Sequence, residues 1–121
     1  DNIDDIMSGL SRVLAEDVGA KAILAASISG DTGRMISKHR PELPVFVATS
    51  NLRVEAQLAL SWGVHPFVLP ECHSIEELIE RSVVHLKEKN LLKKGDRIIV
   101  LAGEPVGQAG HVNLLEVKDI D

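Results

Sequence analysis

The feature that most constrains the fold is a series of short, mostly apolar runs separated by segments with helical periodicity. These runs cover residues 22–26, 45–48, 65–69 and 98–102. Runs of about five residues are too short for free helices, and unbroken apolar character is typical of strands buried on both faces. Strands that alternate with helices form parallel sheets through right-handed crossovers.

Helices are predicted before and between these runs. Apolar residues recur at helical spacing in residues 3–14, and Gly19 is expected to end this first helix. After residues 27–33, a second helix is expected to stop at Pro41, because proline cannot continue a helix. Residues 52–62 indicate a shorter helix that is ended by Gly63.

A long fourth helix has the clearest start signal in the chain. Ser74 and Glu77 are three residues apart, which is the spacing of a capping box. The expected buried stripe of this helix consists of Ile75, Leu78, Ile79, Val83 and Leu86. Its regular 3–4 residue spacing predicts that one side of the helix packs on the sheet.

The last strand is predicted at residues 112–117. It follows the 98–102 strand through a loop without a helix, which is too short for a crossover, so it should be antiparallel at the end of the sheet. The predicted fold is α/β: a three-layer α/β/α sandwich of about five strands, mostly parallel. A length of 121 residues with 45% hydrophobic content fits one domain, residues 1–121, with a real core.

Two glycine-rich loops follow predicted strands, and both lie where ligands bind in parallel sheets, outside the carboxyl ends of the strands. The unpaired amides at a helix N-terminus and its positive dipole end favour a phosphate group. The candidate phosphate-binding residues are Ser27, Ser29, Gly30, Asp31, Thr32 and Gly33 in the first loop and Gly103, Gly107, Gly110 and His111 in the second.

A simpler interpretation of the first loop remains open. Asp31 and Thr32 are good N-cap residues, whose side chains can satisfy the same amides without any ligand. A carboxylate at Asp31 also repels a bound phosphate.

Composition excludes several classes of function. A net charge of -5 and no basic run interleaved with aromatic residues argue against nucleic-acid binding. No membrane-spanning stretch or signal peptide is evident, and one cysteine, Cys72, fits a reducing cytoplasm. The five histidines lack metal-ligand spacing, so no metal site is expected. Ser27 and Ser29 have no identifiable histidine base, so no catalytic residue is assigned.

Several segments, in order, resemble the C-terminal domain of pyruvate kinase. These are GAKAI (19–23), SG (29–30), KHRP (38–41), LALSWGV (58–64), KKGD (93–96), GEPVG (103–107) and NLLEV (113–117). The WGV and GxPVG forms are similar to those of bacterial and archaeal members. The first residue, Asp1, is not methionine, which suggests a fragment of a longer protein.

The resemblance implies a regulatory domain without an active site. In that family phosphoenolpyruvate, ADP, magnesium and potassium bind to a separate β/α barrel, which is absent here, so no cofactor is expected in this domain. Many members bind a phosphorylated effector through the loop that corresponds to Ser27–Thr32 and the late glycine-rich loop, and their C-terminal domains pack subunits together. The implied partners are therefore a phosphorylated metabolite, the catalytic domain and further copies of the chain.

Departures from the family pattern reduce the number of candidate effectors. Asp31, Glu71 and Leu78 occupy positions where members regulated by fructose 1,6-bisphosphate carry a basic residue, a tryptophan and an arginine. The expectation is a monophosphate such as AMP, ribose 5-phosphate or glucose 6-phosphate, or no effector at all, because one cradle holds one phosphate. The alternatives are an oligomerisation module with a vestigial anion site, a freestanding protein of this type, or a small independent enzyme.

Overall fold

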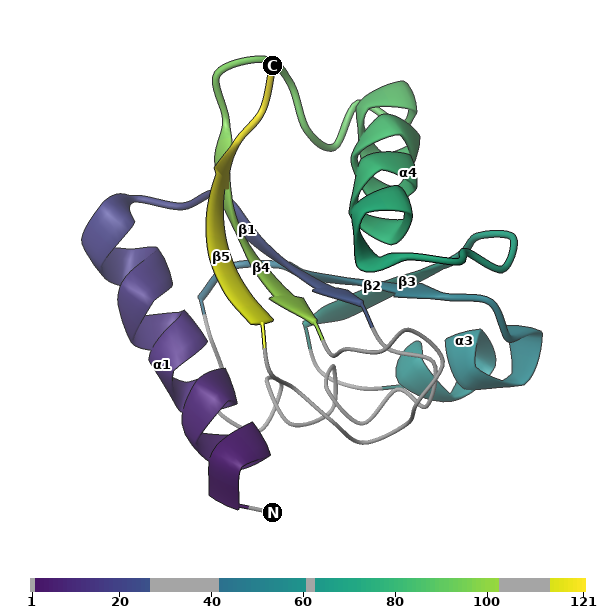
Figure 1. Cartoon of the computed structure of the whole chain (residues 1–121), viewed down its shortest axis with the longest axis horizontal. Helices are drawn as coiled ribbons and strands as arrows, with labels where there is room; N and C mark the ends of the chain where they lie inside the picture. The colour runs from purple at the N-terminus through teal and green to yellow at the C-terminus, as the bar shows by residue number, and fades with distance from the viewer. Residues whose placement is uncertain (1, 27–41, 61–62, 103–113) are drawn as a thin grey trace.

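The computed structural model describes residues 2–26, with side chains from Ile6 onward, and residues 42–60, 63–102 and 114–121 (Figure 1). The elements, in chain order, are α1 (Asn2–Val18), β1 (Ala22–Ala26), β2 (Val45–Thr49), α3 (Leu52–Leu58), β3 (Val64–Val68), α4 (Ile75–Glu88), β4 (Arg97–Ala102) and β5 (Leu114–Asp119). The predicted helix ahead of Pro41 lies outside the described residues.

The strands form one five-stranded sheet in the order β3-β2-β1-β4-β5. β3, β2, β1 and β4 are parallel, and β5 is antiparallel to β4. The predicted α/β fold, with a mostly parallel sheet and an antiparallel last strand, is confirmed.

Helices cover both faces of this sheet, which gives the predicted three layers (Figure 1). On β1, Ala22, Leu24 and Ala26 belong to the core under α4. Ile23 and Ala25 point to the opposite face, where the core includes Ala15 of α1 and Leu58 of α3. Every residue of β1 is buried, because alternate side chains enter different cores.

The ends of α1 and α4 are set by residues with positive φ. Gly19 has φ +68°, and after it the Ala20 N–H donates to the Ala15 carbonyl at 2.9 Å. The α4 end has the same geometry with a non-glycine residue, Asn90, at φ +61°, which the sequence analysis did not single out. Asparagine tolerates this conformation better than most residues, so both helices close with the six-to-one hydrogen bond of a Schellman motif.

The face that α1 turns to the sheet agrees only in part with its apolar periodicity, because Met7 and Leu14 pack against the core. Ser8, Ser11 and Ala15 are buried, whereas Ile6, Leu10 and Val13 are 59%, 50% and 45% exposed. The Ser11 hydroxyl donates to the Ser8 carbonyl at 2.6 Å, which satisfies one polar group on this buried side. The exposed stripe of Ile6, Leu10 and Val13 is called the α1 stripe below.

Two predicted boundaries also differ. α3 ends at Leu58, four residues before the predicted end, and leaves Leu60 90% exposed. β5 extends to Asp119, which pairs with Arg97 in the β4–β5 ladder. The Arg97 Nε donates to the Asp119 carboxylate at 2.7 Å, so the two strands stay paired to this point.

The buried position of Leu24 yields a test of the core. Leu24→Ala should lower the free energy of unfolding by about 2–5 kcal/mol, because it removes a fully buried side chain from the centre of the sheet. Urea denaturation followed by circular dichroism measures the change. The matched variant Leu60→Ala removes the same atoms from an exposed side chain and should change stability by less than about 0.5 kcal/mol. Equal losses in the two variants would contradict the assignment of Leu24 to the core.

Candidate functional site

The sheet has a switch point between β1 and β4. From β1 the chain moves outward to β2 and β3, and it then returns to the other side of β1 to form β4. The register pairs Ala26 with Ala102, the last residue of each strand. The segments that follow β1 and β4 therefore leave the sheet from neighbouring points, at the position where open α/β sheets bind ligands.

All ten predicted phosphate-binding residues follow these two strand ends, and all lie outside the described residues. They are Ser27, Ser29, Gly30, Asp31, Thr32, Gly33, Gly103, Gly107, Gly110 and His111. The strand ends themselves carry only the methyl side chains of Ala26 and Ala102, both buried. Polar contacts to a ligand at this point would have to come from the segments beyond the strands.

α3 begins at the same edge of the sheet, and its first amides already have partners within the chain. The Asn51 side-chain oxygen accepts the N–H groups of Arg53 at 2.8 Å and of Val54 at 3.2 Å. The Asn51 N–H donates to the Thr49 hydroxyl at 3.2 Å, at the end of β2. Asn51 thus serves as the N-cap of α3.

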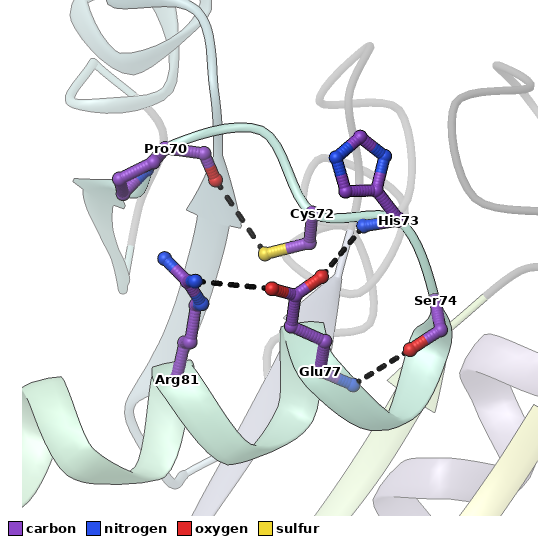
Figure 2. Close-up of polar contacts among 6 residues, drawn as sticks. All are labelled: Pro70, Cys72, His73, Ser74, Glu77 and Arg81. Atoms are coloured by element: carbon purple, nitrogen blue, oxygen red, sulfur yellow. Dashed lines mark hydrogen bonds and ion pairs between the residues drawn. The ribbon is translucent and has the colours of Figure 1, made fainter.

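α4 also caps its own N-terminus, with the predicted capping box (Figure 2). The Ser74 hydroxyl accepts the Glu77 N–H at 3.1 Å, and the Glu77 carboxylate accepts the His73 N–H at 2.7 Å. The other carboxylate oxygen of Glu77 lies 3.0 Å from the Arg81 guanidinium. At both described helix starts on this edge, side chains of the chain itself take the place that an anion would occupy.

Cys72 and His73 do not form a catalytic pair. Figure 2 shows the Cys72 thiol and the His73 ring pointing apart, as expected for neighbouring residues. Cys72 is buried, and its Sγ donates to the Pro70 carbonyl at 3.5 Å. Desolvation by burial raises the pKa of the Cys72 thiol, and the nearby Glu77 carboxylate adds to this effect. The thiol is therefore kept protonated and poorly nucleophilic.

The amino edge of the sheet holds a polar hollow that the sequence analysis missed. It is lined by residues that include Lys21, Asp96, Arg97 and Asp119. Lys21 lies 3.3 Å from Asp96 and Arg97 lies 2.7 Å from Asp119, so each cation faces a carboxylate. Arg97 and Asp119 lie 22 positions apart in the sequence, and the antiparallel pairing of β4 with β5 brings them together.

These ion pairs have a structural role. The Arg97 guanidinium also donates to the Val18 carbonyl at 3.3 Å, which ties the end of α1 to β4 and β5. The Lys93 N–H holds the pKa of Asp96 below its ordinary value, and the hydrogen bond from Arg97 does the same for Asp119. Each of these charges already has a partner within the chain. We therefore interpret the hollow as a place where α1, β4 and β5 are held together, and not as a ligand site.

The described part of the chain brings no three His, Cys, Asp or Glu side chains into a group that could hold a metal ion. Within the same residues, none of the helices has the length and apolar character needed to cross a membrane.

The capping box predicts a specific pH dependence of stability. The hydrogen bond from the His73 N–H lowers the pKa of Glu77, and the Arg81 charge acts in the same direction. The stabilisation is therefore complete above the ordinary glutamate pKa of about 4.3 and is lost as the pH falls through the lowered pKa. Glu77→Gln keeps an acceptor but removes the charge, so it should reduce the melting temperature at pH 7 and converge with the parent in acid.

Thermal melts between pH 7 and about pH 3 measure this convergence. Glu80→Gln is the matched control, because it removes the same charge from an exposed side chain of the same helix. Identical pH profiles for the two variants would contradict a stabilising role of the Glu77 carboxylate.

Comparisons with known proteins agree on one family. The family model described as pyruvate kinase, alpha/beta domain, matches residues 6–118. Pyruvate kinase of Clostridium acetobutylicum is 38% identical over 120 residues, which is 99% of this chain and 25% of that protein. Pyruvate kinase of Sporosarcina psychrophila is 36% identical over 119 residues, which is 98% of this chain and 20% of that protein.

The fold agrees with this result. The structure of Cryptosporidium parvum pyruvate kinase in complex with ADP is similar with a TM-score of 0.87 and 29% identity, and covers 98% of this chain and 24% of that one. The chain spans a fifth to a quarter of the length of these relatives. Since the family model covers nearly the whole sequence and the fold matches as well, the chain belongs to the pyruvate kinase alpha/beta domain family.

Proposed function

We propose that this chain is the regulatory and subunit-packing domain of a pyruvate kinase and that it binds a phosphorylated metabolite at the carboxyl edge of its sheet. The observation that carries the proposal is the pairing of Ala26 with Ala102. The two strands that precede the glycine-rich segments 27–33 and 103–111 therefore end side by side, at a switch point of the sheet. One anion can then be held by backbone amides and hydroxyls from both segments.

The capped starts of α3 and α4 support a phosphate site after β1 and β4, because they exclude two other helix N-termini at this edge. The first amides of α3 are taken by Asn51, and those of α4 by Ser74. Neither helix therefore competes for a phosphate at this edge. The candidate ligand groups that remain here are those of the segments after β1 and β4.

Catalysis in the proposed whole enzyme belongs to a separate barrel, where phosphoenolpyruvate and ADP are converted to pyruvate and ATP with magnesium and potassium. This domain contributes regulation. A metabolite that binds more tightly to one arrangement of the domain shifts the enzyme toward that arrangement, and coupling energies of about 1–3 kcal/mol suffice for a 5–150-fold change in affinity. We expect the protein in the cytoplasm, where the single thiol of Cys72 stays reduced.

The effector proposal predicts saturable binding of a monophosphate. Titration of the chain with AMP, ribose 5-phosphate or glucose 6-phosphate should release or absorb heat and raise the melting temperature, because a ligand that binds only the folded state stabilises it. Ser29→Glu should weaken this binding, since it places a carboxylate where the phosphate is expected.

Ser50→Glu is the matched control for this titration. It introduces the same charge at an exposed position on the same edge of the sheet, after β2 instead of β1. Binding that is weakened equally by both substitutions would show a general charge effect, and no saturable binding of any of the three phosphates would contradict the effector proposal.

The subunit-packing part of the proposal rests on the α1 stripe. Ile6, Leu10 and Val13 follow one another at intervals of four and three residues, so they share one face of α1, and all are exposed. Exposed apolar stripes of this kind are typical of helices that pack on a neighbouring molecule. We infer that a second copy of the chain covers this stripe.

Sedimentation measures that packing. Leu10→Glu should shift the chain toward a smaller species, because it buries a carboxylate in the proposed contact. Val84→Glu, on the exposed side of α4, is the control and should sediment like the parent. A parent chain that is monomeric, or a Leu10→Glu variant that associates normally, would contradict packing through α1.

A second function is favoured by the capping observed at α3 and α4. If the helix predicted ahead of Pro41 were capped in the same way, the anion site would be vestigial and the domain would only hold subunits together. Sedimentation with and without the phosphorylated metabolites distinguishes the two functions, because a purely structural domain assembles identically in both conditions.

A further inference from the structure

A groove of about 370 Å³ lies between α4 and the chain that follows β3. Leu69 and Pro70 line it from the chain after β3, and five residues in the second half of α4 line it from the helix. Ligand pockets in proteins measure about 300–1,000 Å³, so the groove is large enough for a small molecule with an aromatic ring. It is separate from the ends of β1 and β4, because β3 is an edge strand and β2 lies between it and β1.

The lining of the groove is apolar where it meets the core, and it includes an aromatic stack. The His85 ring lies nearly parallel to the buried Phe67 ring, with ring centroids 4.5 Å apart and an interplanar angle of 11°. Leu69 is buried in the core beneath α4, whereas Val84 is 53% exposed. The aromatic ring of a ligand can therefore lie against His85 and Val84 and remove apolar surface from water.

The unpaired charge around the groove is negative. Glu80 and Glu88 lie four residues before and after Val84, so all three side chains share one side of α4. Both glutamates are exposed, and within the described part of the chain neither has an ion-pair partner. The guanidinium of Arg81, which also lines the groove, is already paired with the Glu77 carboxylate at 3.0 Å. Charge complementarity therefore favours a cation in this groove.

Contacts of the capping box hold two residues of the groove in place (Figure 2). The Glu77 carboxylate pairs with Arg81 and also accepts the His73 N–H, which fixes it at the start of α4. The Cys72 thiol donates to the Pro70 carbonyl at 3.5 Å. A groove with walls that are fixed before binding loses little conformational entropy when a ligand enters.

The free edge of β3 is poorly suited to a peptide strand as the occupant. The Val45 N–H donates to the Gly63 carbonyl, and the Leu69 N–H donates to the Thr49 carbonyl. Because backbone groups alternate along a strand, the odd positions of β3 face β2 and Pro66 faces the free edge. Proline has no N–H to donate to a further strand. A small molecule is therefore a better occupant than an added strand.

We propose that this groove binds a small organic cation in which an aromatic ring carries a short ammonium side chain. The ring lies against His85 and Val84, and the ammonium group faces a carboxylate. Glu80 and Glu88 lie about 12 Å apart along the helix axis, one on each side of Val84, so either one can be reached as the ring turns over. The inference goes beyond the proposed function, since it involves neither a phosphate nor a second copy of the chain.

NMR titration tests the site with three probes of nearly equal size and different charge. They are phenethylamine, phenethyl alcohol and phenylacetate, which are cationic, neutral and anionic at neutral pH. Phenethylamine should bind saturably and shift the backbone amide signals of the lining residues. It should bind about two- to fivefold more tightly than the alcohol, as expected for an exposed ion pair, and phenylacetate should bind most weakly.

Substitutions at the groove separate the role of charge from that of shape. Glu80→Gln combined with Glu88→Gln should weaken phenethylamine to the affinity of the alcohol and leave the alcohol unchanged. The matched control, Glu71→Gln combined with Glu76→Gln, removes two exposed carboxylates outside the lining and should preserve the preference for the amine. Val84→Trp fills the groove and should weaken the amine and the alcohol alike.

Each contrary result has a definite meaning. Equal binding of the three probes, tightest binding of phenylacetate, or equal losses in the two double variants would overturn a cation site. No saturable binding of phenethylamine, or amide shifts confined to residues away from the groove, would overturn the groove as a ligand site. If the groove signals broaden with protein concentration alone, a second copy occupies the groove and the proposal is wrong. Thermal melts that match the parent establish that the variants are folded. The phosphate titration tests the proposed function separately.

Discussion

The structure depends on the burial of β1 on both of its faces. This strand lies at the centre of the sheet between β2 and β4, and its alternate side chains enter the two separate cores. A strand of five small and branched apolar residues leaves no polar group to face water, so helices must cover both sides. The three layers follow from this constraint.

At the carboxyl edge of the sheet, the two described helices cap their own N-termini. α3 and α4 close their own N-termini with Asn51, Ser74 and Glu77, and the carboxylate of Glu77 is held in place by Arg81. The segments after β1 and β4 carry hydroxyls and glycines and begin from paired residues. The anion that we propose would therefore bind where β1 and β4 end, away from the capped starts of α3 and α4.

Two helices present more apolar surface than the sheet can cover. α1 turns small residues to the core and leaves Ile6, Leu10 and Val13 exposed, and α3 is apolar on its inner and outer sides. The contact proposed for α1, with another copy of the chain, would cover its exposed stripe.

The sequence by itself determined the α/β class, the order of the elements, the capping box at Ser74 and the glycine that ends α1, because these depend on local periodicity and backbone conformation. Only the tertiary structure decided which side of α1 faces the sheet, where α3 ends, and how Lys21 and Arg97 find their acidic partners across the amino edge. It also decided that β1 and β4 end side by side. Periodicity marks a helix as apolar on one side, but the packing against a particular sheet selects the side, and strand order, which brings distant residues together, depends on contacts that no local segment contains.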